Sequence, residues 1–476
     1  NELPRDLTMS FAGHVGTMGS CLPSSDSGPS QYAGSQARDW RSTSMESDDD
    51  SSLASQKAAY SYFNAQRDFI RGLTNLAERL RFLTPDERQE SLHPGLDSIS
   101  LPQNAYFPLT HSSEKFTRLL RFPHNESIVF NTKARCPLLL VVECVREEYS
   151  VSQALSKSEP DESDAPSVHG KRSAPPLKSS LSLADKKREA WDQKTDRVSK
   201  TSGLSAQPGW SLKSLIVKSN DDVRQEVFIM QMITYFARLF PTEYCWLRPY
   251  HIQATGPDTG LIETITSAQD IDRLKKAPGF VSLRHLFIQR YGQPHSDGFQ
   301  RAQANFCRSL SAYSVVMYLL LLRDRHNGNL MVDDEGHFFH IDFGFVLGHS
   351  TGKQIGGMVE CAPFKLTAEY VDLLDGSNSA VFKTYCEGCV RALKEARRCG
   401  ETILTLIEIA GTRSNFPCFL QTPVGKVLPK LRKRLLMDID EGAVEAEVMR
   451  IIQLACDHKG TRYYDKAQKM QRGIAA

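Results

Sequence analysis

Apolar residues are sparse at the start of the chain and become periodic only after residue 57. Residues 1–57 are rich in Ser, Gly and Asp, and such a segment buries too little apolar area to offset the entropy lost on ordering. We therefore predict that this segment is disordered. The periodic stretch that follows predicts an amphipathic helix, because apolar side chains recur every three or four residues, at Phe69, Leu73, Leu76 and Leu80.

Short apolar runs after this helix indicate strands. Residues 128–130 and 138–142 are predicted as two strands, the second a buried one because it is apolar throughout. From about residue 150 to residue 187 the composition turns polar and rich in proline, and strand signals resume after it. We interpret this stretch as a flexible insertion inside a domain, since lengthening a loop adds little closure entropy.

The middle of the chain predicts a strand, a helix and a hairpin in succession. Residues 215–217 form a short buried strand. The helix after it has one apolar face, made of Val223, Val227, Met230, Ile233 and Ala237. Residues 250–254 and 261–265 predict two strands joined by a turn that contains Gly and Pro. Beyond this point the pattern is helical, interrupted by one hairpin around residues 333–336.

A strand-rich first half and a helical second half predict an α+β protein with two lobes. We expect the strand-rich N-terminal lobe over residues 58–265, with the flexible insertion at about 150–187. The mostly helical C-terminal lobe is expected over residues 266–476. Its tail combines basic and apolar side chains that suit a membrane interface: Lys466, Lys469, Met470, Arg472 and Ile474.

Composition narrows the class of protein. The formal net charge is only +2, so no global field draws the chain to nucleic acid. The longest apolar run, residues 315–322, is too short to span a bilayer and is closed by Arg323. The 11 cysteines are scattered, which suits free thiols in a reducing cytosol. Because the chain starts at Asn1 rather than Met, we expect it to be part of a longer protein.

Two polar segments flank the predicted hairpin. D-R-H-N-G-N at 324–329 precedes it, and H-I-D-F-G at 340–344 ends it. Because the open ends of a hairpin meet, Asn329 and Asp342 should lie together, and their oxygens are hard ligands that suit magnesium. Asp324 or His326 would take the proton of an attacking hydroxyl, and the sequence does not decide between them. The paired segments are the phosphoryl-transfer signature of kinases.

These segments resemble the phosphoinositide 3-/4-kinase superfamily, which has D-R-H where protein kinases have H-R-D. The stretch L-I-V-K-S-N-D-D-V-R-Q-E at 215–226 resembles the lysine strand and following helix of the family, and residues 260–263 resemble its hinge. Residues 363–367 resemble the end of its activation loop. The tail Arg462-Tyr463-Tyr464-Asp465 and the strands before the insertion are similar to the type III beta phosphatidylinositol 4-kinases. The resemblance covers roughly residues 58–474, less the insertion.

The resemblance implies roles for single residues. The catalytic residues would be Lys218, which grips the phosphates of ATP, together with Asp324 and His326. Magnesium, with manganese as an alternative, would be held by Asn329 and Asp342. The remaining contacts to ATP would come from Glu226 on the helix, Glu263 and Ile265 at the hinge, and a phosphate loop near residues 199–203 that includes Ser202 and Gly203. Lys353 and Lys365 would bind the lipid substrate.

The implied activity is ATP-dependent phosphorylation of phosphatidylinositol at the inositol 4-hydroxyl. Residues 345–364 should face the lipid, and their ionisable side chains are only His349, Lys353 and Glu360, which suits a headgroup without extra phosphates. The alternatives are a phosphoinositide 3-kinase, a related large Ser/Thr protein kinase, and a catalytically dead scaffold. The resemblance also implies a cytoplasmic enzyme, peripheral on the cytosolic face of Golgi or related membranes, and small GTPases or adaptors that bind through an upstream domain.

Overall fold

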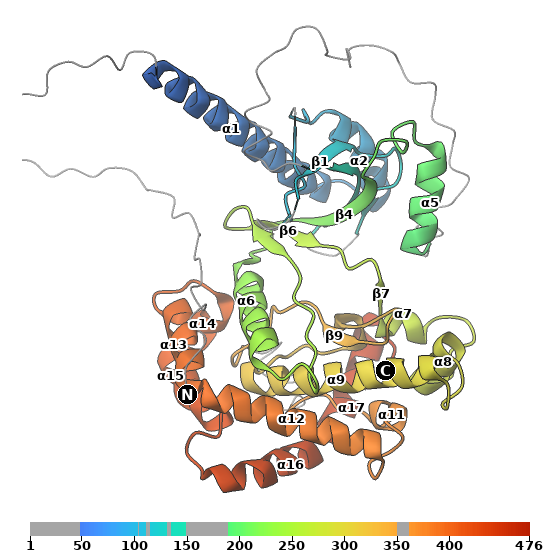
Figure 1. Cartoon of the computed structure of the whole chain (residues 1–476), viewed down its shortest axis with the longest axis vertical. Coiled ribbons are helices and arrows are strands. Elements are labelled where there is room, and N and C mark those ends of the chain that lie inside the picture. The colour runs from blue at the N-terminus through green and yellow to red at the C-terminus, as the bar shows by residue number, and fades with distance from the viewer. Residues whose placement is uncertain (1–47, 103, 111–114, 131–134, 149–188, 350–360) are drawn as a thin grey trace, which may run out of the picture. The chain divides into compact units, whose positions relative to one another are not determined.

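A computed structural model describes residues 48–102, 104–110, 115–130, 135–148, 189–349 and 361–476 (Figure 1). The chain divides into two compact units, Asn1–Ala54 and Ser55–Ala476. Helix α1 (Asp48–Arg81) begins in the first unit and continues into the second. All the other described elements belong to the second unit.

The start of α1 corrects the predicted extent of disorder. The sequence predicts disorder over residues 1–57, yet residues 48–57 are helical. Gln56, Lys57 and Ala58 are good helix formers, and the helix that they join is anchored by its apolar face further along, whereas the prediction weighed apolar content alone. Residues 1–47 lie outside the described residues, and so does the predicted insertion at 150–187.

An antiparallel sheet occupies the first part of the second unit. Its strand order is β1-β3-β4-β6-β5, and β2 pairs with β3. The strands are β1 (Thr117–Arg121), β2 (Ile128–Val129), β3 (Leu138–Arg146), β4 (Trp210–Ser219), β5 (Ile252–Ala254) and β6 (Thr259–Glu263). Every predicted strand of this region is confirmed with shifted ends. β6 takes up part of the predicted turn and ends before Ile265.

One face of the sheet packs against α1 and α2 (Pro85–Asp97). Leu140 of β3 and Val217 of β4 contribute to this hydrophobic core. The predicted apolar face of α1 is confirmed by low exposure, with Phe69 at 2%, Leu73 at 1%, Leu76 at 2% and Leu80 at 2%. On the opposite face a smaller cluster joins the sheet to α5 (Trp191–Thr201).

Helix α6 (Arg224–Leu239) begins shortly after β4, as the sequence predicts. Its buried surface is wider than predicted, because Phe228, Ile229 and Phe236 are buried as well. These side chains belong to the largest hydrophobic core, which is built mainly from the C-terminal helices. The helix that follows the Lys218 strand is therefore held by the helical part of the molecule.

The second half is mostly helical, in agreement with the prediction. Its helices are α7 (Ile271–Lys275), α8 (Leu283–Tyr291), α9 (Asp297–Leu320), α11 (Ala368–Leu373), α12 (Ala380–Arg398), α13 (Gly400–Gly411), α14 (Pro417–Gln421), α15 (Val424–Arg434), α16 (Val444–Ala455) and α17 (Lys459–Arg472). The 24-residue α9 is central, and nearly all of its second half is buried.

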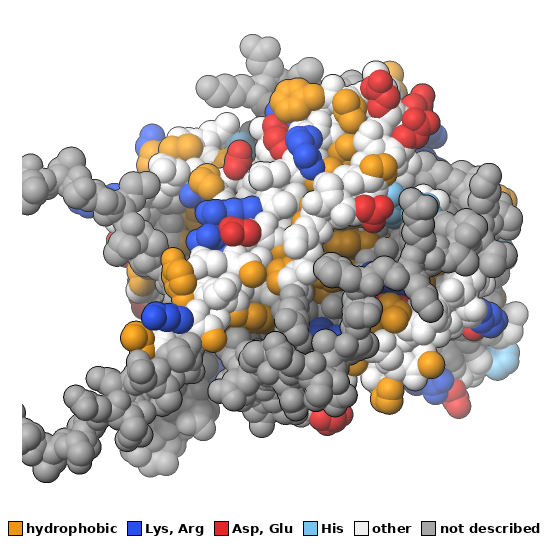
Figure 2. Space-filling view, turned by 90° about the horizontal axis from the view of Figure 1, so that it is seen from above, with side chains coloured by type: hydrophobic (Ala, Val, Ile, Leu, Met, Phe, Trp, Pro, Cys, Tyr) orange, Lys and Arg blue, Asp and Glu red, His pale blue; other side chains and the backbone are white. Residues whose placement is uncertain are grey.

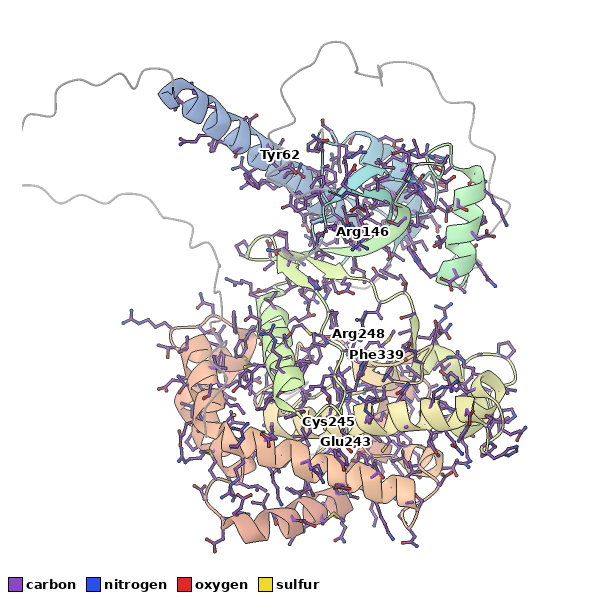
Figure 3. All side chains as sticks on the ribbon, in the orientation of Figure 1. Tyr62, Arg146, Glu243, Cys245, Arg248 and Phe339 are labelled. Carbon is purple, nitrogen blue, oxygen red and sulfur yellow. The ribbon has the colours of Figure 1, made fainter. Side chains whose placement is uncertain are left out.

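The predicted hairpin is present as β8 (Leu330–Asp333) and β9 (Phe338–His340). Phe339 of β9, labelled in Figure 3, is fully buried. A third strand, β7 (Ala268–Asp270), pairs with β8. The sequence does not predict β7, because Ala-Gln-Asp has neither the length nor the apolar content of a typical strand.

None of the helices in the described part of the chain combines the length and apolar character needed to cross a bilayer. Figure 2 shows a face on which Lys and Arg side chains are interspersed with Asp and Glu. This mixture agrees with the net charge of +2. Attraction to a charged surface would therefore have to come from a local patch.

Candidate active site

The β8–β9 hairpin brings two polar segments together at its open end. Leu330 pairs with His340, and the Ile341 amide donates to the Asn329 carbonyl at 3.1 Å. Asn329 ends a short 3₁₀ turn (Asn327–Asn329), and Asp342 follows Ile341 directly. The predicted juxtaposition of these two segments is confirmed.

The donor atoms at this end of the hairpin suit a hard cation. The Asn329 side-chain nitrogen donates to the Asp324 carbonyl at 2.9 Å, so the amide oxygen is the atom that a cation would contact. Asp342 is exposed, and its Oδ1 accepts from the Gly344 amide at 3.3 Å. Within the described residues no group of three or more His, Cys, Asp or Glu side chains could hold a metal ion. The Asn329 amide and the Asp342 carboxylate are the kinds of oxygen ligand that magnesium accepts when phosphate oxygens and water complete its coordination.

Arg325 joins the two segments from inside. It is 2% exposed, and its guanidinium donates to the carbonyls of Ile341, at 2.7 Å, and Asp342. Its Nε donates to the Arg323 carbonyl at 2.8 Å. Because these bonds go to the backbone of both segments, Arg325 has a structural role.

Asp324 and His326 lie beside this arrangement and are both buried. The His326 Nε2 is 3.9 Å from Asp324 Oδ2. Burial lowers the pKa of His326, although the Asp324 carboxylate acts in the opposite direction. The imidazole is therefore mostly neutral near pH 7 and able to accept a proton. The hydroxyl of Tyr464, on α17, donates to Asp324 Oδ1.

Lys218 stands near the end of β4 in a cluster of carboxylates. Its Nζ is 3.2 Å from Glu226 Oε1 and 3.2 Å from Asp221 Oδ2. Burial by itself would lower the pKa of Lys218, but the carboxylates of Glu226, Asp221 and Asp342 outweigh it and raise the pKa. The ammonium group is therefore charged, and it lies close enough to Asp342 for the two sites to interact.

Gln225 links the lysine region to the hairpin region. Its side-chain nitrogen donates to the carbonyls of Phe343 and Gly344, each at 2.9 Å, and its oxygen accepts from the Cys418 amide at 2.9 Å. Sequence reasoning assigned no role in the active site to Asp221 or Gln225, although both stand inside the D-D-V-R-Q-E motif that it quoted. The motif itself could have indicated these two residues, because polar residues at the start of a helix usually have specific hydrogen-bond partners.

The predicted phosphate loop is wrong. Ser202 ends α5, and its hydroxyl donates to the buried Glu143. The segment leads into the Trp210 end of β4, and Lys218 is eight residues further on, about 26 Å at the usual rise of a strand. Ser202 and Gly203 therefore lie too far from Lys218 to share a phosphate with it.

The connection between β2 and β3 lies at the correct end instead. Leu138 pairs with Val217, so residues 135–137, which lead into β3, approach Lys218. Arg135 in this connection forms an ion pair with Asp221 at 2.8 Å, and residues 131–134 lie outside the described residues. Sequence reasoning missed this loop because it contains no glycine and precedes Lys218 by some eighty positions.

The hinge residues lie where the sheet meets the helical part. Glu263 ends β6, and its carboxylate accepts from the His251 amide at 2.8 Å and from Arg248, labelled in Figure 3, at 3.4 Å. Ile265 is half-buried against the main core. Glu263 therefore orients the backbone that precedes Ile265.

The predictions for the two substrate lysines have different outcomes. Lys353 lies outside the described residues. Lys365 is buried, and its Nζ donates to Asp465 Oδ1 at 2.8 Å, Asn327 Oδ1 at 3.1 Å and the Arg325 carbonyl at 3.1 Å. With its ammonium hydrogens used inside the protein, Lys365 does not face a headgroup. This corrects the prediction, which assigned Lys365 to binding of the lipid substrate.

The chain is similar to known proteins over this region. Residues 213–420 match the family described as phosphatidylinositol 3- and 4-kinase. A phosphatidylinositol 4-kinase of Dictyostelium discoideum is 42% identical over 290 residues, which cover 60% of this chain and 24% of that protein. Phosphatidylinositol 4-kinase beta 1 of Arabidopsis thaliana is 40% identical over 293 residues, covering 60% and 26%. Phosphatidylinositol 4-kinase beta of Xenopus laevis is 35% identical over 289 residues, covering 60% and 35%. The chain thus spans about a quarter to a third of the length of these relatives.

Proposed function

We propose that this chain is a member of the phosphatidylinositol 3- and 4-kinase family and that it transfers the γ-phosphate of ATP to the inositol 4-hydroxyl of phosphatidylinositol. The observation that carries the proposal is the convergence of Lys218, Asn329 and Asp342. Gln225 holds the segment of Asp342 to the helix that follows Lys218. The choice of phosphatidylinositol and of the 4-hydroxyl is supported by the names of the relatives.

In this proposal, Lys218 contacts the phosphates of ATP, and Glu226 and Asp221 hold its ammonium group in place. The backbone around Glu263 and Ile265 contacts the adenine. Asn329 and Asp342 hold magnesium, which supplies positive charge to the phosphoryl oxygens when it is bound. Arg135, in the described part of the β2–β3 connection, supplies a further cationic contact to the phosphates.

Asp324 and His326 act on the attacking hydroxyl. Both are buried beside the open end of the hairpin, and the low pKa of His326 leaves a neutral imidazole. A neutral imidazole and a carboxylate are each able to accept the proton that the inositol hydroxyl loses. The 3.9 Å between them allows one group to orient the other after a small movement.

We further propose that the enzyme is peripheral on the cytosolic face of Golgi or related membranes. The exposed side of α17 supports this proposal, because Met470 is 87% exposed and stands among Lys466, Lys469 and Arg472. An apolar side chain surrounded by basic ones suits the headgroup region of an anionic membrane. The second basic segment, α15, is a weaker candidate, since Arg432 already pairs with Glu401 at 2.9 Å.

The substrate class is tested by offering radiolabelled ATP together with different acceptors. The acceptors are vesicles of phosphatidylinositol, vesicles of phosphatidylinositol 4,5-bisphosphate at matched surface concentration, and a generic protein substrate. We expect label mainly in phosphatidylinositol, because residues 345–364 provide few cationic partners for extra phosphates. Preference for the bisphosphate would favour a 3-kinase, and label only in the protein would favour a protein kinase.

A further inference from the structure

Helix α17, red in Figure 1, packs on the segment that contains Asp324. Tyr464 in this helix is 7% exposed, and Asp324 is 6% exposed. The Tyr464 hydroxyl donates to Asp324 Oδ1, between residues 140 positions apart in the chain. The other carboxylate oxygen, Oδ2, is 3.9 Å from His326 Nε2 and 4.0 Å from Arg472 Nη1. The carboxylate is thus held between α17 and His326.

The direction of the hydrogen bond follows from its second partner. The Gln468 side-chain nitrogen, one turn further along α17, donates to the Tyr464 oxygen at 2.9 Å. That oxygen is therefore used as an acceptor toward Gln468, and its single hydrogen is available for Asp324. An ionised carboxylate only accepts hydrogen bonds, so the arrangement suits charged Asp324.

A second link fixes α17 to the same segment. Asp465, next to Tyr464, pairs with Lys365, and Lys365 also donates to Asn327 and to the Arg325 carbonyl. The Asn327 side-chain nitrogen donates to the Ala475 carbonyl at 2.8 Å, just beyond the helix. These contacts hold the backbone of the segment, while Tyr464 reaches the Asp324 side chain itself.

The backbone conformation of Asp324 is unusual. Its φ is +60°, in the left-handed region that few residues other than Gly adopt, although Asp tolerates it better than most. Several staggered rotamers are open to an Asp side chain, so a hydrogen bond from a neighbour restricts the orientation of the carboxylate. The Tyr464 hydroxyl is one neighbour that donates to the Asp324 carboxylate.

We propose that Tyr464 is a positioning residue for phosphoryl transfer. The Tyr464 hydroxyl holds the Asp324 carboxylate beside the attacking hydroxyl of the substrate. The Gln468 side chain orients the Tyr464 hydroxyl toward Asp324. This inference rests on the proposed function only as far as the chain transfers phosphoryl groups, and it does not depend on the lipid. It assigns α17 a role in the chemical step in addition to any contact with a membrane.

Tyr464→Phe removes the hydroxyl and keeps the ring. Tyr463→Phe is the matched control, because Tyr463 is the preceding residue of the same helix and is 67% exposed. For both variants, kcat and the KM for ATP are measured with phosphatidylinositol vesicles. ATP hydrolysis without lipid, vesicle co-sedimentation and melting temperature complete the set.

We expect Tyr464→Phe to lower kcat by about tenfold or more, in lipid phosphorylation and in lipid-free hydrolysis alike, since misplacing a catalytic group is costly. The KM for ATP and vesicle binding should stay within about twofold of wild type, and Tyr463→Phe should match wild type throughout. Unchanged lipid-free hydrolysis in Tyr464→Phe, with vesicle binding lost, would overturn the proposal and make α17 a membrane element only.

A double-mutant cycle separates positioning from a general structural role. If Tyr464 acts through Asp324, adding Tyr464→Phe to Asp324→Asn should reduce kcat no further, because the two changes remove one unit. If the kcat losses of the two single variants instead multiply in the double variant, the proposal is overturned. If Tyr464→Phe does not fold, the variant Gln468→Met tests the proposal in its place. A lower kcat at unchanged KM for ATP would support the positioning role of Tyr464, and a wild-type kcat would overturn it. A wild-type protein that hydrolyses ATP but leaves lipid unlabelled would contradict the proposed function alone.

Discussion

Lys218, which is half-buried, and Lys365, which is buried, differ in the balance of charge around their ammonium groups. Lys218 faces the carboxylates of Glu226 and Asp221, with Asp342 nearby, and its pKa is raised. Lys365 has one carboxylate partner, Asp465, and two neutral acceptors, and burial lowers its pKa. Two carboxylates lie 3.2 Å from the Lys218 ammonium and a third, that of Asp342, acts on it, whereas the Lys365 ammonium pairs with one carboxylate. The number of carboxylates around each lysine, rather than burial alone, therefore separates the two sites.

The largest expected effect comes from removing the first lysine. Lys218→Met should lower phosphoryl transfer at least about a hundredfold, because the variant loses a main electrostatic contact to the phosphates. Turnover is measured with ATP and phosphatidylinositol vesicles, and circular dichroism checks that the variant is folded. A folded Lys218→Met variant that keeps more than about a tenth of wild-type turnover would contradict the assignment of Lys218 to catalysis and of Lys365 to stability.

The second lysine should affect stability first. Lys365→Met leaves Asp465 buried without its cation, and breaking a buried pair in this way costs about 3–5 kcal/mol of unfolding free energy. Urea denaturation measures the loss. The double variant Lys365→Met/Asp465→Leu should recover much of it, since apolar pairs often replace buried ion pairs well. Full stability in Lys365→Met with lost lipid binding would restore the original assignment to the substrate site.

A smaller effect is expected at the loop that approaches Lys218. Arg135→Ala should raise the KM for ATP several-fold with little change in kcat, because the β2–β3 connection is proposed to contact the phosphates and Arg135 is half-exposed at its ion pair with Asp221. Initial rates at varied ATP concentration test this. A wild-type KM would mean that the connection does not contact the nucleotide.

The smallest effect is expected at the discarded phosphate loop. Gly203→Ala should change neither the KM for ATP nor the melting temperature, because no atom lies within 4 Å of a Cβ at this position. A glycine that lets backbone approach a phosphate would not tolerate the methyl group. Loss of ATP affinity in this variant would return the phosphate loop to residues 199–203.

The sequence predicted what depends on short stretches of chain. The hairpin between residues 329 and 342 needs only two strands and a turn, so the meeting of Asn329 and Asp342 could be predicted without other information. The apolar face of α1 and the strand and helix around Lys218 are likewise local patterns. The predicted disorder extended too far, because residues 48–57 belong to helix α1 and the prediction did not take helix propensity into account.

What the sequence could not predict depends on partners far along the chain. Lys365 and Asp465 are 100 positions apart, and Tyr464 and Asp324 are 140 apart. The phosphate loop was misplaced because the strand order puts β3 beside β4, although α5 and the insertion separate them in sequence. The helix α17 that completes the surroundings of Asp324 gave no local signal beyond the Tyr-Tyr-Asp motif.

The ring position of the transferred phosphate tests the central claim most directly. Phosphatidylinositol vesicles are incubated with labelled ATP and wild-type chain, with Asp342→Ala as the inactive control, and the product is deacylated and separated by chromatography. We predict a single product labelled at the inositol 4-position with wild type, and no labelled lipid with Asp342→Ala. A product labelled at the 3-position, or equal labelling by the Asp342→Ala variant, would contradict the account.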